Sequence, residues 1–421
     1  MRLAGSALAC ATLAALSLLV PAAPGYDAWA WLSWGREIGS LSLDTAAGPA
    51  WKPLPVMVTT LLAPFGDAAP DLWLLVARTG AIAAVVLAAL VAWRLKAPPW
   101  ASAVAALAVV LTGGFVRHAA VGDAEPLLVA LMLAAFERGL AGRHRQALAL
   151  GALAALVRPE VWPFLAAFGI WRWRDGESRA LLSALALAVP AAWVVPELLS
   201  SGELFRSAAR ARIPNPGQPA TADVPALATL AAAAGVVFVP AALAALGARR
   251  AAALPALAGV AWIALVALMS EAGFSGEPRY LLPGAALIAV SGAVAMARMR
   301  PLLPLALVAV AVAGAFRVAD VADLGPRLRY QHELAAGLDR AIAHAGGRDA
   351  VLACGRPAVG RYRGTLLAYR LDVPKRTVIA DGSAGAVTFR SRLTGRAPAS
   401  PPAAGRVVAE TPRWEVAATC D

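Results

Sequence analysis

Residues 145–173 read RQALALGALAALVRPEVWPFLAAFGIWRW, an apolar stretch that is interrupted at its middle by Arg158-Pro159-Glu160. About 20 apolar residues suffice to cross a bilayer once, so the stretch is long enough to be a single span. Proline cannot continue the helical hydrogen-bond ladder, however, and it favours two short helices that meet at a turn. The choice between a crossing and a re-entrant hairpin decides on which side of the membrane every later segment lies.

Apolar residues dominate the whole chain. Hydrophobic residues make up 60% of the 421 residues, charged residues make up 15%, and the mean hydropathy is +0.66. Soluble domains are nearer half apolar and a quarter charged, so this composition predicts a membrane protein. The apolar runs that predict about nine full spans are 3–20, 72–93, 101–116, 124–139, 181–199, 225–246, 252–270, 280–297 and 301–317. With the broken hairpin at 146–173, they predict an all-α polytopic membrane bundle over residues 1–317.

Basic residues flank the apolar runs, and their placement favours the hairpin. The formal net charge is +12, but no basic stripe or aromatic-basic module indicates nucleic-acid binding. The clusters are Arg2; Arg94 and Lys96; Arg138, Arg143 and Arg145; Arg172 and Arg174; Arg249 and Arg250; and Arg298 and Arg300. With a hairpin all of them lie on one side, whereas a single crossing moves every cluster from Arg172 onward to the other. Because Lys and Arg accumulate on the cytoplasmic side, the N-terminus is expected inside and the C-terminus outside.

Two terminal segments complete the expected architecture. Run 3–20 is interpreted as a retained helix, and a cleaved signal peptide is the alternative. Residues 318–421 lack long apolar runs and contain β-like runs at 350–353, 377–380, 386–389 and 406–409 after a helical stretch at 334–345. They predict a small extracytoplasmic α/β domain, in which Cys354 and Cys420 are expected to lie close enough to bond.

The outer loops and the hairpin turn carry the unusual polar residues. The candidate site residues are Tyr26, Asp27, Arg36, Glu37, Lys52, His118, Asp123, Glu125, Arg158, Glu160, Arg279 and Tyr280. Simpler interpretations exist for several of them: helix capping, complementing a helix dipole, anchoring at the interface, or pairing of Arg158 with Glu160. The tryptophans at 29, 31 and 34 are interpreted as an aromatic belt at the headgroup level.

The functional interpretation rests on the expected convergence of charged residues from different loops. Carboxylates from the first two outer loops and Arg279 from the fourth are expected on one face, beside a turn at membrane depth. A carboxylate near a hydroxyl can act as a general base, and arginine binds phosphate through paired hydrogen bonds. Such a set suits transfer of a group from a lipid-borne phosphate to a hydroxyl.

At these residues the chain resembles membrane glycosyltransferases of the GT-C fold, in particular mannosyltransferase-like actinobacterial members. The motifs that carry the resemblance are Tyr26-Asp27, Trp34-Gly-Arg-Glu37, Lys52-Pro-Leu-Pro55, Gly122-Asp-Ala-Glu-Pro126, Arg158-Pro-Glu160 and Pro278-Arg-Tyr-Leu-Leu-Pro283. They cover about residues 1–317, and their order and sidedness together are more specific than any one motif.

The resemblance implies a polyprenyl-phosphate sugar donor and chemistry on the outer face. It implies that Asp27 is the catalytic base and that Asp123 or Glu125 also serves the site. Lys52, Arg158 and Arg279 are expected to hold the donor phosphate. Many members have adjacent acidic residues in the first loop, whereas Ala28 follows Asp27 here. No cofactor or metal ligand is therefore assigned, and a divalent cation remains an alternative.

The sequence thus predicts a multi-pass plasma-membrane enzyme. Its expected activity is transfer of a hexosyl or pentosyl group from a polyprenyl-phosphate carrier to an extracytoplasmic lipid, glycan or protein. Two other classes remain as alternatives. A transporter or lipid flippase also has broken helices and midplane charges, although no internal repeat supports it. A non-catalytic membrane scaffold would use the C-terminal region to bind a partner.

Overall fold

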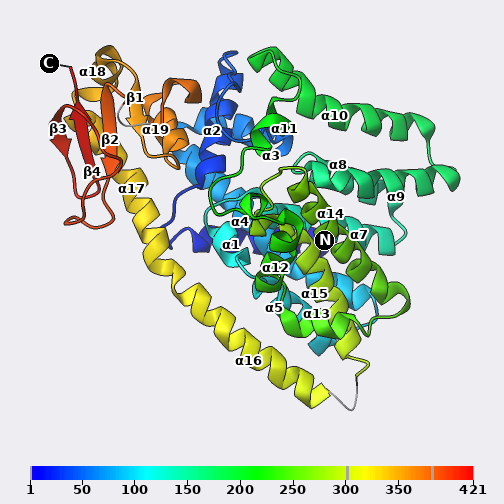
Figure 1. The fold of residues 1–421 in the computed structure, drawn as a ribbon. Coiled ribbons are helices and arrows are strands. Elements are labelled where there is room, and N and C mark those ends of the chain that lie inside the picture. Colours follow the sequence, from blue (N-terminus) through cyan, green and yellow to red (C-terminus); the bar gives the residue numbers. More distant parts are fainter. Residues whose placement is uncertain (1, 300–302, 381–383, 421) are drawn as a thin grey trace.

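The chain forms a helical body with a small sheet at its C-terminal end, in a computed structural model that describes residues 2–299, 303–380 and 384–420 (Figure 1). The longer helices of the body are α1 (Arg2–Ser17), α2 (Tyr26–Gly39), α3 (Pro53–Leu62), α4 (Ala69–Arg94), α5 (Pro99–Val110), α6 (Phe115–Ala120), α7 (Ala124–Leu140), α8 (His144–Ala155), α9 (Trp162–Arg174), α10 (Arg179–Ser201), α11 (Arg206–Ala211), α12 (Pro225–Val236), α13 (Val239–Ala245), α14 (Ala253–Glu271), α15 (Leu282–Met296) and α16 (Leu303–Ala322). Short 3-10 turns connect them, notably η1 (Ala63–Ala68), η2 (Pro159–Val161) and η5 (Pro278–Leu281).

Helix α15 is the centre of the body, because every one of its residues is buried. Glycines let its neighbours approach closely. A Cβ atom at Gly292 would lie 1.9 Å from the Ala241 carbonyl oxygen on α13, and one at Gly259 would lie 2.5 Å from the Gly284 oxygen. Small residues at helix contacts are typical of membrane bundles, where close packing replaces the hydrophobic driving force.

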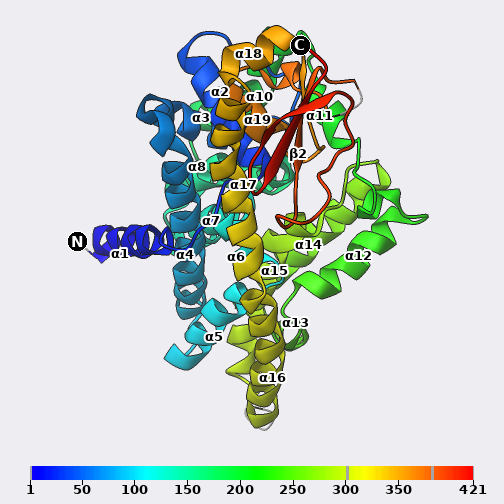
Figure 2. The same cartoon turned by 90° about the vertical axis from the view of Figure 1, so that its left-hand side faces the viewer.

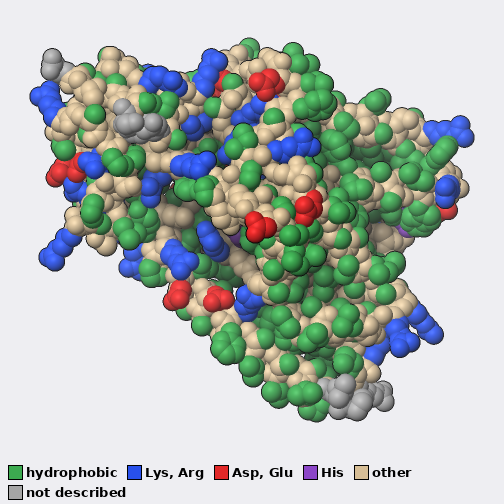
Figure 3. All heavy atoms as spheres, viewed as in Figure 1, with side chains coloured by type: hydrophobic (Ala, Val, Ile, Leu, Met, Phe, Trp, Pro, Cys, Tyr) green, Lys and Arg blue, Asp and Glu red, His purple; other side chains and the backbone are tan. Residues whose placement is uncertain are grey.

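Several helices are suited to a membrane. Among the described residues, five helices are long and apolar enough to cross one: Pro53–Arg94, Arg179–Ser201, Arg250–Glu271, Pro278–Met296 and Leu303–His344. Figure 3 shows apolar side chains over most of the helical body, whereas Lys and Arg gather over the C-terminal part and at the far tips. The protein is therefore a multi-pass, mostly helical membrane protein.

The segment around Pro159 folds back on itself. Helices α8 and α9 flank η2, and the ring of His144 at the start of α8 lies 5.3 Å from the ring of Trp171 near the end of α9. Nearby, Arg145 Nε lies 3.0 Å from Glu177 Oε1. The two ends of the segment thus lie together, which is the geometry of a hairpin and not of one crossing helix.

The expected span at 225–246 is not one continuous helix. The chain forms α12 and α13, which meet at 107° across an extended break at Val237 and Phe238. An exposed backbone carbonyl at membrane depth is costly, and that of Val236 accepts a hydrogen bond of 2.7 Å from the Gly113 N–H. A contact with a distant loop therefore stabilises the break.

Two further expected spans are shorter than predicted. Run 101–116 yields α5, which ends at Val110 before a separate short α6. Run 3–20 yields α1, a helix of 16 residues that runs across the long axis of α4 (Figure 2). Of residues 5–17 of α1, whose side chains the structure describes, Cys10 and Ala14 are buried and the others are partly or fully exposed. The span expected at 301–317 begins outside the described residues and continues beyond 317 as α16.

The C-terminal part contains α17 (Leu324–His344), α18 (Gly347–Cys354), α19 (Gly364–Leu371) and strands β1 (Pro357–Val359), β2 (Val387–Ser391), β3 (Arg406–Glu410) and β4 (Trp414–Ala418). The sheet order is β1-β2-β4-β3, with β1 parallel to β2 and the other pairs antiparallel. Helix α17 packs on this sheet, where the Trp414 indole donates to the Leu334 carbonyl at 2.9 Å.

The sequence predicted some elements of the C-terminal part correctly and others wrongly. The strands at 386–389 and 406–409 are confirmed within one or two residues. Residues 334–344 are helical as expected, but their helix α17 begins ten residues earlier than predicted, at Leu324. The strand expected at 350–353 is wrong, since those residues belong to α18, and 377–380 contributes only an isolated bridge at Ile379. No helix break falls at the expected boundary of 317 and 318, because α16 and α17 run on almost continuously.

The expected pairing of Cys354 with Cys420 is confirmed. The two residues form a disulfide with a Cα–Cα separation of 5.6 Å and a sequence separation of 66 residues. Closing a loop of this length in the unfolded chain is expected to stabilise the C-terminal part by about 4 kcal/mol.

We predict that changing Cys354 and Cys420 together to serine lowers the thermal unfolding midpoint of the C-terminal part. The physical reason is the greater conformational entropy of the unlinked unfolded chain. Thermal unfolding of the purified protein, with and without reductant, measures the effect. Cys10→Ser is the control, because Cys10 is a free cysteine. An unchanged midpoint in the double variant would contradict the prediction.

Candidate active site

Charged side chains meet where several helices begin. Asp27 lies in the first turn of α2, and Glu125 lies in the first turn of α7, two residues after Asp123 at its N-cap. Lys52 and Arg158 occupy the N-cap positions of α3 and η2. Because the positive ends of helix dipoles point toward this region, it favours anions and carboxylates.

Proline explains the local backbone. Lys52 and Arg158 each precede a proline that occupies the first helical position, where its missing N–H costs nothing. The residue before proline is pushed into extended conformation. Both residues obey this rule, with φ and ψ of -136° and 105° for Lys52 and -147° and 133° for Arg158. The proline thus turns each side chain aside from its helix.

Arg279 of η5 connects the starts of α2 and α7. Its Nη2 lies 3.1 Å from Asp27 Oδ2, and its Nη1 lies 3.5 Å from Asp123 Oδ1. Its Nε also contacts Glu277 Oε2 at 2.5 Å. The Arg279 side chain is 15% exposed, so these contacts are largely shielded from water.

Lys52 and Arg158 share a second carboxylate. Lys52 Nζ lies 3.2 Å from Glu125 Oε1 and 3.9 Å from Asp27 Oδ2. Arg158 Nη1 lies 3.1 Å from the same Glu125 oxygen, and its Nε donates to Glu160 at 3.1 Å. The Arg158 guanidinium also lies 3.5 Å from the centroid of the Tyr280 ring, a cation–π distance.

We call Asp27, Lys52, Asp123, Glu125, Arg158, Glu160 and Arg279 the charge cluster. His118 lies at its edge, with Nδ1 2.7 Å from Asp123 Oδ2. The cluster holds four carboxylates and three side-chain cations. The converging helix N-termini supply further positive potential, which helps to stabilise the excess carboxylate.

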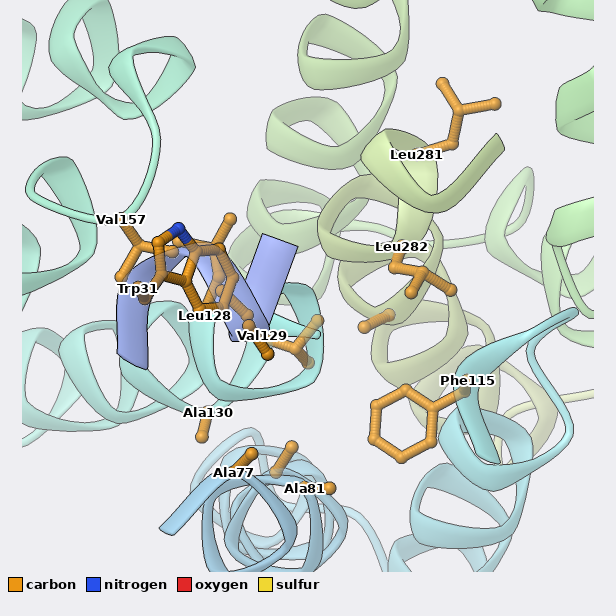
Figure 4. Close-up of a cluster of buried hydrophobic side chains, with 14 of the residues drawn as sticks. Trp31, Ala77, Ala81, Phe115, Leu128, Val129, Ala130, Val157, Leu281 and Leu282 are labelled. Atoms are coloured by element: carbon orange, nitrogen blue, oxygen red, sulfur yellow. The ribbon is translucent and has the colours of Figure 1, made fainter. Parts of the chain in front are cut away.

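An apolar layer lies beneath the charge cluster. Figure 4 shows Trp31, Leu128, Val157 and Leu282 in one buried cluster with Ala77 and Ala81 of α4, together with neighbouring apolar residues. Trp31 follows Asp27 by about one helical turn, as Leu128 follows Glu125, and Val157 directly precedes Arg158. Asp27, Glu125 and Arg158 are therefore anchored through their own helix or turn to a packed core.

Three candidates of the first loop do not contribute side-chain ion pairs to this cluster. Arg36 Nε lies 2.9 Å from Asp372, and Glu37 Oε2 accepts the Asp44 N–H at 3.0 Å. Burial is the main cause that raises the pKa of Glu37 to about 7. The carbonyl of Tyr26 accepts a hydrogen bond of 2.8 Å from Thr365 Oγ1 of α19. These residues connect α2 to its own loop and to the C-terminal part.

The aromatic-belt interpretation of the first loop is wrong. Trp29, Trp31 and Trp34 are 3%, 0% and 1% exposed. The Trp29 ring lies 5.1 Å from that of Tyr369 on α19, and the Trp34 indole donates to the Asp44 carbonyl at 3.0 Å. The segment is helix α2, covered by the C-terminal part, and its tryptophans form core instead of facing headgroups.

The sequence missed three residues near the site. Glu277 pairs with Arg279 and accepts a hydrogen bond of 3.0 Å from the Gln218 side chain of the third loop. Glu277 precedes a proline, as Lys52 does, so the proline pattern was an available signal. Gln218 also precedes a proline, at the start of η3 (Pro219–Thr221), so the same signal was available for it. Thr365 has no such signal, because its contact depends on a distant segment.

Within the described ranges, no group of three or more His, Cys, Asp and Glu residues is arranged to hold an ion. The Arg279 guanidinium lies between Asp27 and Asp123, where a bridging divalent cation would otherwise be expected.

The arrangement has two chemical capabilities. Asp27 Oδ1 makes no hydrogen bond to any described residue, so this oxygen is available to accept a proton. The cations Lys52 and Arg279, beside helix N-termini, provide fixed positive charge for an anion. Figure 3 shows a hollow between the C-terminal part and the helical body, with Lys and Arg side chains on its walls.

Comparisons with known proteins reveal the fold. No protein-family model matches the sequence, and no curated protein matches it. Among solved structures, ArnT from Cupriavidus metallidurans bound to undecaprenyl phosphate matches with a TM-score of 0.62 and 15% sequence identity. The match covers 98% of this chain and 97% of that chain. The chain therefore has a GT-C-like fold along nearly its whole length, C-terminal part included.

We predict that Arg158→Met destabilises the protein by about 3–5 kcal/mol, because it leaves Glu160 buried without its cation and weakens the pairing of Glu125. Thermal unfolding in detergent measures the loss. Arg348→Met is the matched control, since that side chain is 50% exposed on α18. Adding Glu160→Gln to Arg158→Met is expected to recover part of the stability. Equal midpoints for Arg158→Met and Arg348→Met would contradict this account.

Proposed function

We propose that the protein is a glycosyltransferase that moves a sugar from a polyprenyl-phosphate carrier to a hydroxyl group of an extracytoplasmic acceptor. The observation that carries the proposal is the pairing of Asp27 with two cations, Arg279 and Lys52, at converging helix N-termini. A proton acceptor next to an anion site is what this reaction requires. The GT-C-like fold supports the same class of enzyme.

The proposed step is a displacement at the anomeric carbon of the donor sugar. The acceptor oxygen forms a bond to that carbon as the bond to the phosphate oxygen breaks, and the polyprenyl phosphate leaves with the electron pair. The acceptor proton passes to Asp27. Lys52 and Arg279 stabilise the charge that develops on the leaving phosphate, which fixed cations do well in a site shielded from water.

The other cluster residues have supporting roles in this proposal. Glu125 is fully buried between Lys52 and Arg158, so it fixes the Lys52 ammonium in place. Asp123 contacts Arg279 and His118, and it orients the guanidinium toward the donor. Arg158 is mainly occupied by Glu160 and Glu125, so its contribution to phosphate binding is weaker than that of Lys52 or Arg279.

The proposed orientation places the charge cluster and the C-terminal part outside and the N-terminus inside. Basic ends of several helices lie at the opposite end of the body from the cluster. Arg94 at the end of α4 pairs with Glu137 near the end of α7 at 2.8 Å, and Arg298 after α15 donates to the Arg249 carbonyl at 3.5 Å. Accumulated arginine favours the cytoplasmic side.

The finer assignment concerns sugar, acceptor and metal. The sequence motifs favour a mannosyltransferase-like enzyme, so a hexose is the first expectation and a pentose the second. The partners are a polyprenyl-phosphate sugar, an extracytoplasmic lipid, glycan or protein acceptor, and the bilayer. We propose that transfer needs no divalent cation, because Arg279 supplies positive charge between Asp27 and Asp123.

We predict that Asp27→Asn lowers the rate of transfer by about 10²–10⁴-fold, the usual contribution of a general base. The assay uses purified protein in lipid nanodiscs, labelled polyprenyl-phosphate mannose or polyprenyl-phosphate arabinose, and a cell-envelope extract as acceptor. Binding of polyprenyl phosphate should not weaken, because the change removes negative charge beside Lys52 and Arg279. Asp349→Asn, whose side chain is 95% exposed, is the control.

The same assay separates the alternatives. Wild-type rates should be unchanged by a chelator, and a chelator-sensitive rate restored by added Mg²⁺ or Mn²⁺ would overturn the metal-independent proposal. Wild-type transfer rates in Asp27→Asn would overturn the assignment of the base. In proteoliposomes, which separate the two faces of the bilayer, movement of the intact lipid phosphate across the membrane without consumption of either sugar donor would instead favour a flippase.

A further inference from the structure

A cavity lies between the helical body and the C-terminal part. Its volume is about 760 Å³, within the range of small-molecule sites. One wall comes from α2, α3 and η1, including Leu32, Thr59 and Asp67, and the other comes from α17 and α19, including Ala336. Neither part of the chain forms this cavity alone.

The cavity is separate from the charge cluster. None of the charge-cluster residues lines it. Arg36, which does, follows Asp27 by nine residues on α2, so the two residues lie about 13.5 Å apart along the helix and on opposite faces. Thr59 lines the cavity and donates to the Trp31 carbonyl at 2.6 Å, while the Lys52 ammonium lies 5.1 Å from the Trp31 ring. Trp31 thus stands between the cavity wall and the cluster.

Paired donors and acceptors line the cavity. Arg36 Nε lies 2.9 Å from Asp372 Oδ1, and Arg370 Nη1 lies 3.2 Å from Asp339 Oδ2. Asp67 makes no hydrogen bond or ion pair with any described residue, and it lines the same cavity. Each guanidinium has five N–H donors and each carboxylate about four acceptor positions, so these pairs leave hydrogen-bonding capacity unused.

This lining selects among ligand classes. Three carboxylates against two guanidinium groups disfavour a phosphate or other anion, and the fixed guanidinium groups disfavour a simple cation. A hydroxyl both donates and accepts, so adjacent hydroxyls can bridge a carboxylate and its guanidinium partner. The lining therefore suits an uncharged ligand that is rich in hydroxyl groups.

We propose that this cavity binds neutral carbohydrate, namely sugar units of a glycan acceptor at a distance from its reacting end. The choice of carbohydrate rests on the proposed function, whereas the cavity and its lining do not. A glycan held on one face of α2 could present a distant hydroxyl to Asp27 on the other. Since α2 and α19 both form the wall, the bound glycan also links the C-terminal part to the helix that carries Asp27.

Direct binding of neutral oligosaccharides to the full-length protein in lipid nanodiscs tests this proposal. The probes are linear α-mannan and arabinan oligosaccharides of graded length, measured by isothermal titration calorimetry. Affinity should rise with length until the cavity is filled. Ala336→Trp, at an exposed position on α17, should weaken binding about tenfold or more by filling the cavity. Ala343→Trp, also exposed on α17 but outside the cavity lining, should leave binding unchanged.

Two further variants keep the test independent of folding and of catalysis. Asp67→Ala changes an exposed residue, and it should weaken binding without changing the thermal unfolding midpoint. Asp27→Asn should bind oligosaccharide like the wild type although it fails in transfer, which separates this proposal from the proposed function. The proposal would be overturned if the wild type did not bind the oligosaccharides. It would also be overturned if Ala336→Trp and Asp67→Ala bound them as tightly as the wild type does. Displacement of the sugars by phosphatidylethanolamine vesicles would instead identify a lipid-headgroup site.

Discussion

The buried carboxylate of Glu125 is the group on which the rest of the site depends. A charge without water must be paired, and Glu125 Oε1 lies within hydrogen-bond distance of both Lys52 and Arg158. These contacts fix the start of α3 and the turn of the α8–α9 hairpin to the start of α7. Lys52 in turn lies 3.9 Å from Asp27, whose position on α2 is also held by Arg279. The geometry proposed for catalysis is thus a consequence of satisfying one buried charge.

The sequence revealed the fold where a local rule decides it. Proline at 159 and the arginine clusters indicated the hairpin, because both act through backbone geometry or solvation of single residues. The break between α12 and α13 escaped prediction, since it depends on a hydrogen bond from Gly113, far away in sequence. The region of α18 was expected to be a strand from its apolar run, which cannot distinguish a short strand from a short helix.

The site was predictable to the extent that proline marked it. Lys52, Glu125 and Arg158 each precede a proline at a helix start, and such positions recur in the loops that were predicted to lie outside. The roles of Arg36 and the tryptophans of α2 were not predictable, because contacts with α19 decide them. The docking of α19 on α2 brings together residues more than three hundred positions apart, such as Tyr26 and Thr365. No periodicity or motif in α2 carries that information.

The most direct test of the account is an experimental structure of the protein in nanodiscs with polyprenyl phosphate bound. The account predicts the phosphate within hydrogen-bond reach of Lys52 Nζ and the Arg279 guanidinium, with the Asp27 carboxylate facing the side where the sugar would lie. Phosphate bound elsewhere, with the ion pairs of Lys52 and Arg279 unchanged, would contradict the central claim that the charge cluster is the donor site.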